Sequence, residues 1–290
     1  MITTSTSKHN TYRTGVALLL LSAVVFSSAG IFTKYVAADG WNVIFWRGLS
    51  AAIITFGFAI AAGKFRAELR AFDLTAVFAV VLMGTASAAF ISSFKHTSVA
   101  NVALLWACAP FVAALQSWLF LREAPTKRVL ACSTLALVGV AITLSSSFGS
   151  GNLFGDMLAL IMVILMAGTM VLYRARPGLP TMTPTALSSV MLLPVAAWFT
   201  PPSAASVADI SVLILFGLVF AIASVLLIEG AKWVPSAQAA LLGALETPLA
   251  PIWAFLILSE KPTMATLIGG GVIMTAIILS QRGTRNRETL

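Results

Sequence analysis

The sequence predicts an all-α integral membrane protein, with ten transmembrane helices arranged as two inverted five-helix repeats. Composition is the first observation behind this prediction, because the 290 residues are 59% hydrophobic and only 10% charged. Soluble domains carry roughly 25% charged residues. One water-soluble core could not enclose so many apolar side chains, so we expect most of them to face lipid.

Ten apolar runs are the second observation. A transmembrane helix needs about 20 mostly apolar residues, each adding about 1.5 Å of length. The predicted spans are Thr14–Val36, Trp41–Ala62, Asp73–Phe94, Ser98–Phe120, Arg128–Ser146, Leu153–Tyr173, Pro184–Thr200, Ile210–Ala231, Ser236–Leu258 and Thr263–Gln281. The first run is too long for the core of a signal peptide, so we expect it to be a retained helix.

An internal duplication is the third observation. Adding 137 to the residue number carries Lys95 onto Lys232, Asn101 onto Gln238, Pro110 onto Thr247 beside Pro248, Glu123 onto Glu260, and Pro125 onto Pro262. Two related units of about half the chain are therefore joined end to end. We place the first repeat at residues 14–150 and the second at 151–281, with tails at 1–13 and 282–290.

Basic residues gather on one side of the predicted membrane. With a cytoplasmic N-terminus, the inner side collects 14 of the 18 lysines and arginines, the outer side has 3, and Arg47 lies within the second span. The positive-inside rule then places both termini in the cytoplasm. Because each repeat has five helices, the second enters from the opposite face. Many secondary transporters share this arrangement and bind substrate near the bilayer midplane between the repeats.

Each repeat also carries a recurring motif: a helix of small residues with a mid-helix proline, then a helix end with glutamate and a basic or proline-containing turn. The motif reads Ala109-Pro110 and Leu121-Arg122-Glu123 in the first repeat, and Leu245-Glu246 and Leu258-Ser259-Glu260 in the second. Here the chain resembles the ten-helix, EamA-like branch of the drug/metabolite transporter superfamily, and within it the aromatic amino-acid exporters. The resemblance covers nearly the whole chain. It implies an exporter of a bacterial-type inner membrane, with an alternating-access cavity and no bound cofactor.

Glu246 lies near the middle of the ninth predicted span and Arg47 near the outer third of the second, where charge is costly and marks a function or a paired group. Glu246 could bind a substrate ammonium group or a coupling proton. It could also hydrogen-bond backbone groups freed by Pro248 and Pro251. The chain departs from the family at Thr247, which stands where proline is usual. Arg47 could pair with an anionic group or extend to the outer interface.

The end of the third span and the fourth span collect aromatic and polar side chains. Such a mixture could bind the carboxylate of an amino acid while rings stack against its side chain. The candidate substrate-binding residues here are Phe90, Ser92, Ser93, His96, Asn101 and Trp106. Lys95 and His96 fall in a predicted outer turn that water could reach, more readily for Lys95 than for His96. Trp106 could be an aromatic wall of the cavity or a packing residue.

Further candidates are weaker. Ser27 could reach substrate or could be part of a small-residue packing surface, as could Ser224. Met166 belongs to a methionine face that could adapt to several substrates or could be core. The proline positions Pro110 and Pro248 are plausible bending points for gating.

Other function classes fit the sequence poorly. An intramembrane enzyme would need a nucleophile near a base or a set of metal ligands, and the spans have no such group. A channel would need a carbonyl filter or a charged ring. Two transporter hypotheses remain: an exporter of aromatic and other neutral amino acids or similar amphiphilic metabolites, and a multidrug exporter of organic cations. Both are compatible with proton coupling or with facilitated diffusion.

The expected partners are a small-molecule substrate and the lipid bilayer. Nucleic acid is not expected, because the basic residues sit in short connectors between apolar runs. Cys108 and Cys132 lie inside apolar segments, so we expect packing thiols and no disulfide. These residues do not indicate an oligomeric state.

Overall fold

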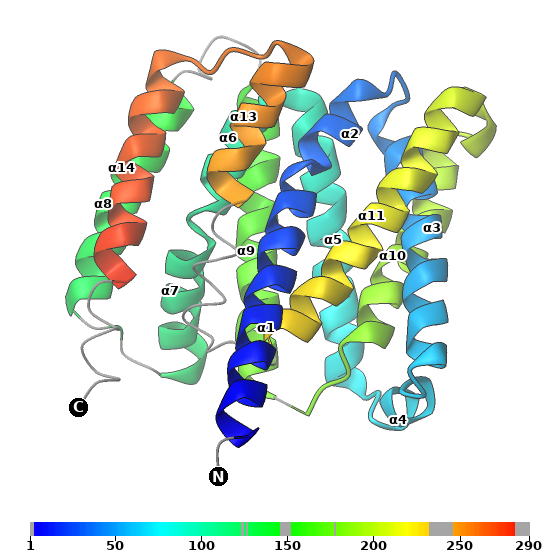
Figure 1. Cartoon of the computed structure of the whole chain (residues 1–290). Coiled ribbons are helices and arrows are strands. Elements are labelled where there is room, and N and C mark those ends of the chain that lie inside the picture. The colour runs from blue at the N-terminus through cyan, green and yellow to red at the C-terminus, as the bar shows by residue number, and fades with distance from the viewer. Residues whose placement is uncertain are drawn as a thin grey trace.

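The computed structural model describes residues 3–122, 125, 127–145, 152–176, 178–231 and 246–281, which form a bundle of helices (Figure 1). The helices are α1 (Thr3–Ser27), α2 (Ala29–Tyr35), α3 (Gly40–Ala61), α4 (Phe65–Arg70), α5 (Leu74–His96), α6 (Val99–Trp106), α7 (Ala109–Leu121), α8 (Lys127–Ser145), α9 (Leu153–Ala175), α10 (Met182–Phe199), α11 (Val207–Ala231), α13 (Glu246–Leu258) and α14 (Met264–Gln281). One 3₁₀ turn, η1 (Pro202–Ala204), precedes α11.

The helices confirm the predicted membrane architecture. Seven described segments are long and apolar enough to cross a bilayer, and two of them, Tyr12–Tyr35 and Val99–Leu121, are each built from two consecutive helices. Shorter apolar helices occupy Leu130–Ser145, Glu246–Leu258 and Met264–Ala276, at the fifth, ninth and tenth predicted spans. The first half of the predicted ninth span lies outside the described residues.

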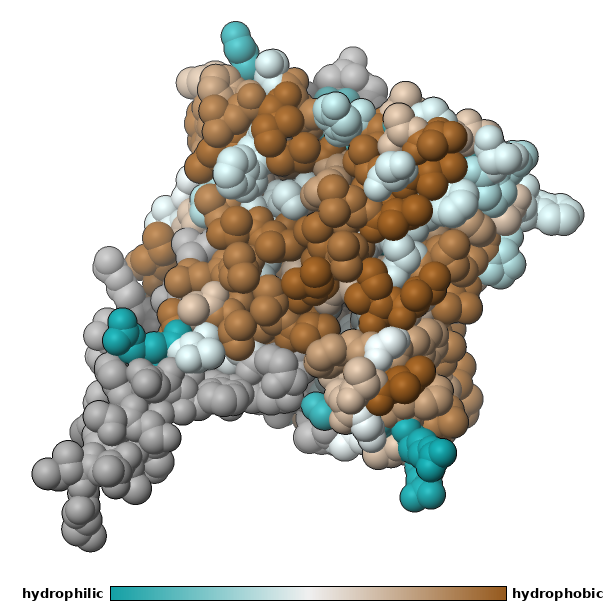
Figure 2. Space-filling model, turned by 45° about the vertical axis from the view of Figure 1, so that its right-hand side comes forward, coloured by the Kyte–Doolittle hydropathy of each residue, from teal (hydrophilic) through white to brown (hydrophobic). Residues whose placement is uncertain are grey.

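The outer surface is apolar along the middle of the bundle. Figure 2 shows a broad hydrophobic face, with the hydrophilic residues gathered toward the two ends. Many large apolar side chains are exposed in the bundle; Trp198 has 87% of its surface exposed and Phe120 has 69%. Exposed apolar area of this extent suits a lipid environment and not water.

The duplication is visible in the backbone. Helices α7 and α13 have 13 residues each, and the residues that follow them, Arg122 and Ser259, are the only described non-glycine residues with positive φ, at 58° and 54°. A left-handed residue directly after a helix is a common C-terminal cap. Their numbers differ by 137, the offset found in the sequence. In Figure 1, α7 runs toward the end of the bundle where α1 begins and α13 runs toward the opposite end, as inverted repeats require.

The two repeats are interleaved. The most extensively packed helix pairs are α8 with α14, α3 with α10, α5 with α9, and α1 with α11. Each pair joins one helix from either repeat. The bundle is therefore one packed body and not two separate five-helix units.

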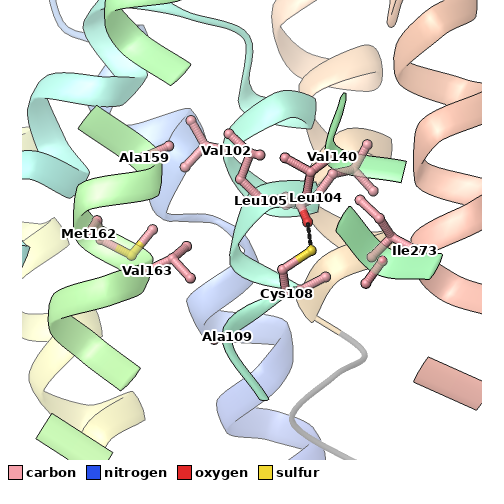
Figure 3. Packing of buried hydrophobic residues seen from close by; sticks show 14 of the residues in the cluster. Val102, Leu104, Leu105, Cys108, Ala109, Val140, Ala159, Met162, Val163 and Ile273 are labelled. Atoms are coloured by element: carbon pink, nitrogen blue, oxygen red, sulfur yellow. Dashed lines mark hydrogen bonds between the residues drawn. The ribbon is translucent and has the colours of Figure 1, made fainter. Parts of the chain in front are cut away.

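A hydrophobic cluster where the fourth span meets its neighbours is shown in Figure 3. Val102 and Leu105 of α6 pack there with Met162 of α9 and Ile273 of α14, all at most 3% exposed. Cys108 lies in the same cluster, and both cysteines are buried and free. They are packing residues, as the sequence indicated.

A glycine seam joins α14 to α8. A Cβ atom at Gly269 would meet Thr143 Oγ1 and would lie 2.6 Å from the carbonyl oxygen of Gly139. Gly271, two residues further along α14, has nothing within 4 Å. Close approach of helix backbones through small residues is a common packing mode in membranes. The seam therefore involves Gly269 and not Gly271.

We expect Gly269→Ala to lower the free energy of unfolding by about 1–3 kcal/mol, because the added methyl group overpacks a backbone contact. Gly271→Ala, on the open face of the same helix, should be neutral or raise stability by up to about 1 kcal/mol. Equilibrium unfolding in mixed detergent micelles measures both variants. Equal stability of the two would show that the close approach is absent.

Candidate functional site

Two spans are interrupted midway along the bundle. The first breaks at Ser28, between α1 and α2, and the fourth breaks at Ala107–Cys108, between α6 and α7. At each break a backbone N–H bonds the carbonyl three residues earlier, from Ser28 to Val25 and from Cys108 to Leu105. The Ser28 hydroxyl also donates to Val25, at 2.6 Å. Backbone freed inside a membrane needs such partners.

A cavity lies beside these breaks. It holds about 300 Å³ of empty space when the space at its open side is included. Its lining residues are Phe26, Ser27, Gly30, Phe90, Phe94, Val102, Ala103, Trp106, Glu246, Thr247 and Ala250. They come from α1, α2, α5 and α6 of the first repeat and from α13 of the second. The cavity is therefore enclosed between the two repeats.

Four of the residues that we named from the sequence come together here. Phe90 and Trp106 supply rings, Ser27 a hydroxyl, and Glu246 a carboxylate. The Ser27 hydroxyl accepts a 3.0 Å hydrogen bond from Trp253 Nε1 of α13 and donates to the carbonyl of Val24. It is thus oriented by the opposite repeat.

Glu246 stands in the first turn of α13 and is half-buried. No hydrogen bond or ion pair links its carboxylate to another described residue, although it lines a mostly apolar cavity. The N-terminal turn of a helix favours a negative charge. The bond to proline-freed backbone that we considered is not seen among the described residues.

The two proline positions flank the cavity. Pro110 lies in the first turn of α7, just beyond the break that follows Trp106. Pro248 lies in the first turn of α13, next to the lining residue Thr247. A proline in a first turn leaves no intrahelical hydrogen bond unmade. Pro110 therefore marks a helix start, and Pro251 lies inside α13.

The other named residues lie outside the cavity lining. Ser92 is half-buried on α5, Met166 packs against the hydrophobic cluster of Figure 3, and Ser224 donates to the carbonyl of Phe220 within α11. Ser93 is buried and donates to the carbonyl of Phe90 at 2.7 Å. None of these four residues contacts the cavity in the described structure, and their role in substrate binding stays a prediction.

Helix α5 extends two residues beyond its predicted end at Phe94, so Lys95 and His96 are helical and the predicted turn there is wrong. Ser98 then caps α6 by accepting from the backbone of Asn101. Lys95 is half-buried and donates to the carbonyl of Val36 at 2.9 Å. His96 is exposed and contacts the ring of Phe154. His96 is thus the more exposed of the two side chains, whereas we expected Lys95 to be.

Asn101 belongs to a buried polar network. Its amide nitrogen lies 3.2 Å from both carboxylate oxygens of Asp156, and its side-chain oxygen accepts from Thr266 at 2.9 Å. The hydroxyl of Thr97 donates to Asp156 at 2.6 Å. Asp156 is fully buried in the first turn of α9. It therefore does more than complement the helix dipole, since it joins α5, α6, α9 and α14.

Glu260 ties the repeats together at the end of the bundle toward which α13 runs. One carboxylate oxygen accepts from Lys34 Nζ at 2.9 Å, and the other accepts from the backbone N–H of Val99 at 2.7 Å. Lys34 is in the last turn of α2, and Val99 begins α6. Both helices line the cavity further along. We call this contact the Glu260 tie.

Several lining residues were missed by sequence reasoning. Phe94 lies one helical turn from Phe90, and Val102 and Ala103 lie one turn from Trp106. Residues three or four apart share a face of a helix. Helical spacing from the named aromatic residues could therefore have found them. Phe26 and Ala250 had no comparable signal.

Taken with the helix arrangement, this cavity defines the class: a multi-pass membrane transporter with two inverted repeats. Residues 13–145 and 153–281 each match the EamA-like transporter family. The chain belongs to that family.

The chain is also similar to two known proteins. An uncharacterized transporter of Archaeoglobus fulgidus is 26% identical over 274 residues, which cover 93% of this chain and 97% of that protein. A protein of known crystal structure shares the fold with a TM-score of 0.67 at 17% identity, over 91% of this chain and 96% of the other. At that identity the second likeness concerns the fold alone.

We expect Asp156→Ala to lower the free energy of unfolding by about 3 kcal/mol, because Thr97 and Asn101 lose a charged acceptor. Asp209→Ala is the matched control, since Asp209 is also a first-turn acid but lies near the surface. It should cost under about 1 kcal/mol. Thermal and detergent unfolding measure both variants. A small effect of Asp156→Ala would contradict the structural role of the network.

Proposed function

We propose that the chain is a secondary transporter that exports small amphiphilic metabolites, foremost aromatic and other neutral amino acids, by alternating access through the central cavity. The composition of the cavity carries this proposal. Four aromatic side chains, Phe26, Phe90, Phe94 and Trp106, surround a single carboxylate, Glu246. Rings offer a broad apolar contact for a substrate side chain, and the carboxylate offers a partner for an ammonium group.

Charge argues against strongly anionic substrates. Sugar phosphates and nucleotides need several cationic groups for recognition, and the described lining contains no lysine or arginine. An apolar body with a small polar head suits the cavity better. A multidrug exporter of organic cations is the second candidate. The observation that favours it is the carboxylate of Glu246, which has no partner among the described residues.

The membrane setting is also part of the proposal. The distribution of lysine and arginine supports cytoplasmic termini in a bacterial-type inner membrane. The cavity then lies between cytoplasm and exterior, and the Glu260 tie lies on the outer side of the cavity. Because the tie joins the two repeats, it has to break when the cavity opens outward.

We expect Glu260→Gln to favour the outward-open state, because the substitution removes the ion pair with Lys34 and weakens the contact to Val99. The measurement is maleimide labelling of an Ala103→Cys reporter in the cavity, in a background where Cys108 and Cys132 are serine. Labelling should become severalfold faster than in the same reporter with native Glu260. Lys34→Met should act in the same direction. An unchanged labelling rate in both variants would show that the Glu260 tie does not control opening of the cavity.

The proposed substrate is tested by counterflow in proteoliposomes. Vesicles loaded with unlabelled phenylalanine or tryptophan should accumulate the labelled amino acid. Trp106→Ala should raise the substrate concentration for half-maximal exchange about tenfold, since a lost aromatic contact of this size costs about 1–2 kcal/mol.

Trp198→Ala is the matched control, because Trp198 is 87% exposed on the outer surface. It should leave exchange unchanged. No exchange of any amino acid by folded protein would reject the amino-acid assignment. Exchange of organic cations by the same preparation would then support the second candidate.

A further inference from the structure

Arg47 places a positive charge inside the bundle. It lies seven residues into α3 from Gly40, about 10 Å along the helix axis, and only 2% of its surface is exposed. Its Nη2 donates to Ser87 Oγ at 2.5 Å, and its Nε has no hydrogen-bond partner among the described residues. A buried guanidinium with one neutral partner is costly inside a membrane protein.

No described carboxylate offsets this charge. Six of the acidic residues are engaged elsewhere: Asp39 and Asp73 cap α3 and α5, Glu68 caps α10, Asp209 accepts from Ala37, and Asp156 and Glu260 form the contacts described above. Glu229 follows Phe220 by nine residues on α11, about 13 Å along the axis. The remaining described acid, Glu246, lines the cavity.

Two aromatic rings in series, Phe220 and then Phe26, link Arg47 to the cavity. The guanidinium carbon lies 4.9 Å from the ring centroid of Phe220 and 5.6 Å from that of Phe216. The Phe220 ring packs edge-on against Phe26, with centroids 5.2 Å apart. Phe26 lines the cavity together with Glu246. A turn of the Phe26–Phe220 pair would therefore open the cavity toward Arg47.

We infer that Arg47 binds the carboxylate of the substrate, and that the transported molecules are zwitterions with an apolar body. This inference rests on the proposed function of the cavity. A guanidinium binds carboxylates through paired N–H donors, and the Nε of Arg47 still offers one. The substrate makes this contact after entry, when the ring pair turns aside.

Charge balance selects the zwitterion. An ammonium group neutralises Glu246, and a carboxylate neutralises Arg47. One zwitterion therefore satisfies two charges that lack a counter-charge among the described residues. An organic cation would leave Arg47 unpaired. An organic anion would leave Glu246 unpaired and would meet its negative charge. Arg47 thus separates the two transporter hypotheses that the cavity lining alone leaves open.

The test uses three ligands of one shape: phenylalanine, phenethylamine, which lacks the carboxylate, and 3-phenylpropionate, which lacks the ammonium group. Binding to the purified full-length protein is measured by calorimetry. Wild type should bind phenylalanine about tenfold or more tightly than either analogue, since a hydrogen bond to a charged group contributes about 1.5–3 kcal/mol.

In Arg47→Gln, the preference for phenylalanine over phenethylamine should fall to less than about threefold, while the preference over 3-phenylpropionate persists. Glu246→Gln should show the reverse pattern. Arg47→Lys keeps the charge without the planar fork and should give an intermediate preference. It also serves as the test variant if Arg47→Gln does not fold. A purely structural role of Arg47 would weaken phenylalanine and phenethylamine equally.

An unchanged preference for phenylalanine over phenethylamine in folded Arg47→Gln and Arg47→Lys would overturn the inference and leave the proposed function intact. Tighter binding of phenethylamine than of phenylalanine by wild type would also overturn it, in favour of organic cations. The proposed function fails separately, if the counterflow experiment shows no amino-acid exchange.

Discussion

Hydrogen bonding of the backbone in an apolar medium is the constraint on which this structure depends. In lipid an unpaired N–H or carbonyl group costs several kcal/mol, so a broken helix is tolerated only where protein or a cavity surrounds the break. The interruptions at Ser28 and Ala107–Cys108 meet this condition, because both lie beside the central cavity. The helices are therefore broken next to the cavity that we propose as the substrate site.

The site depends on where the two repeats differ. The offset of 137 relates α7 to α13 residue by residue, including the left-handed caps at Arg122 and Ser259. Under that offset Ala109 corresponds to Glu246, so the carboxylate in the cavity is present in only one repeat. Duplication thus supplies the symmetric framework of the bundle. Divergence at single positions gives the cavity its charge.

The sequence allowed the spans, the repeat and part of the cavity to be predicted, for identifiable reasons. The length and hydropathy of an apolar run are local properties of the sequence, so the spans could be predicted without knowing how the helices pack. Trp106 and Glu246 were found because an indole and a carboxylate stand out among apolar neighbours.

The Asp156–Asn101 network could not be predicted, because its members are 55 residues apart and meet only when α6 and α9 pack. The opposite exposures of Lys95 and His96 escaped prediction for the same reason, since Lys95 is covered by the carbonyl end of another helix.

Interleaving of the repeats limits how the transporter that we propose can move. The largest helix contacts, such as α8 with α14 and α5 with α9, each join the two repeats. Rocking one whole repeat against the other would separate all of these pairs and expose their packed faces. Bending at the broken helices would leave the pairs in contact, because α2, α6 and α13 are short segments that meet at the cavity. The breaks that allow a binding site inside the bundle are therefore also the places where the bundle can open with the least loss of packing.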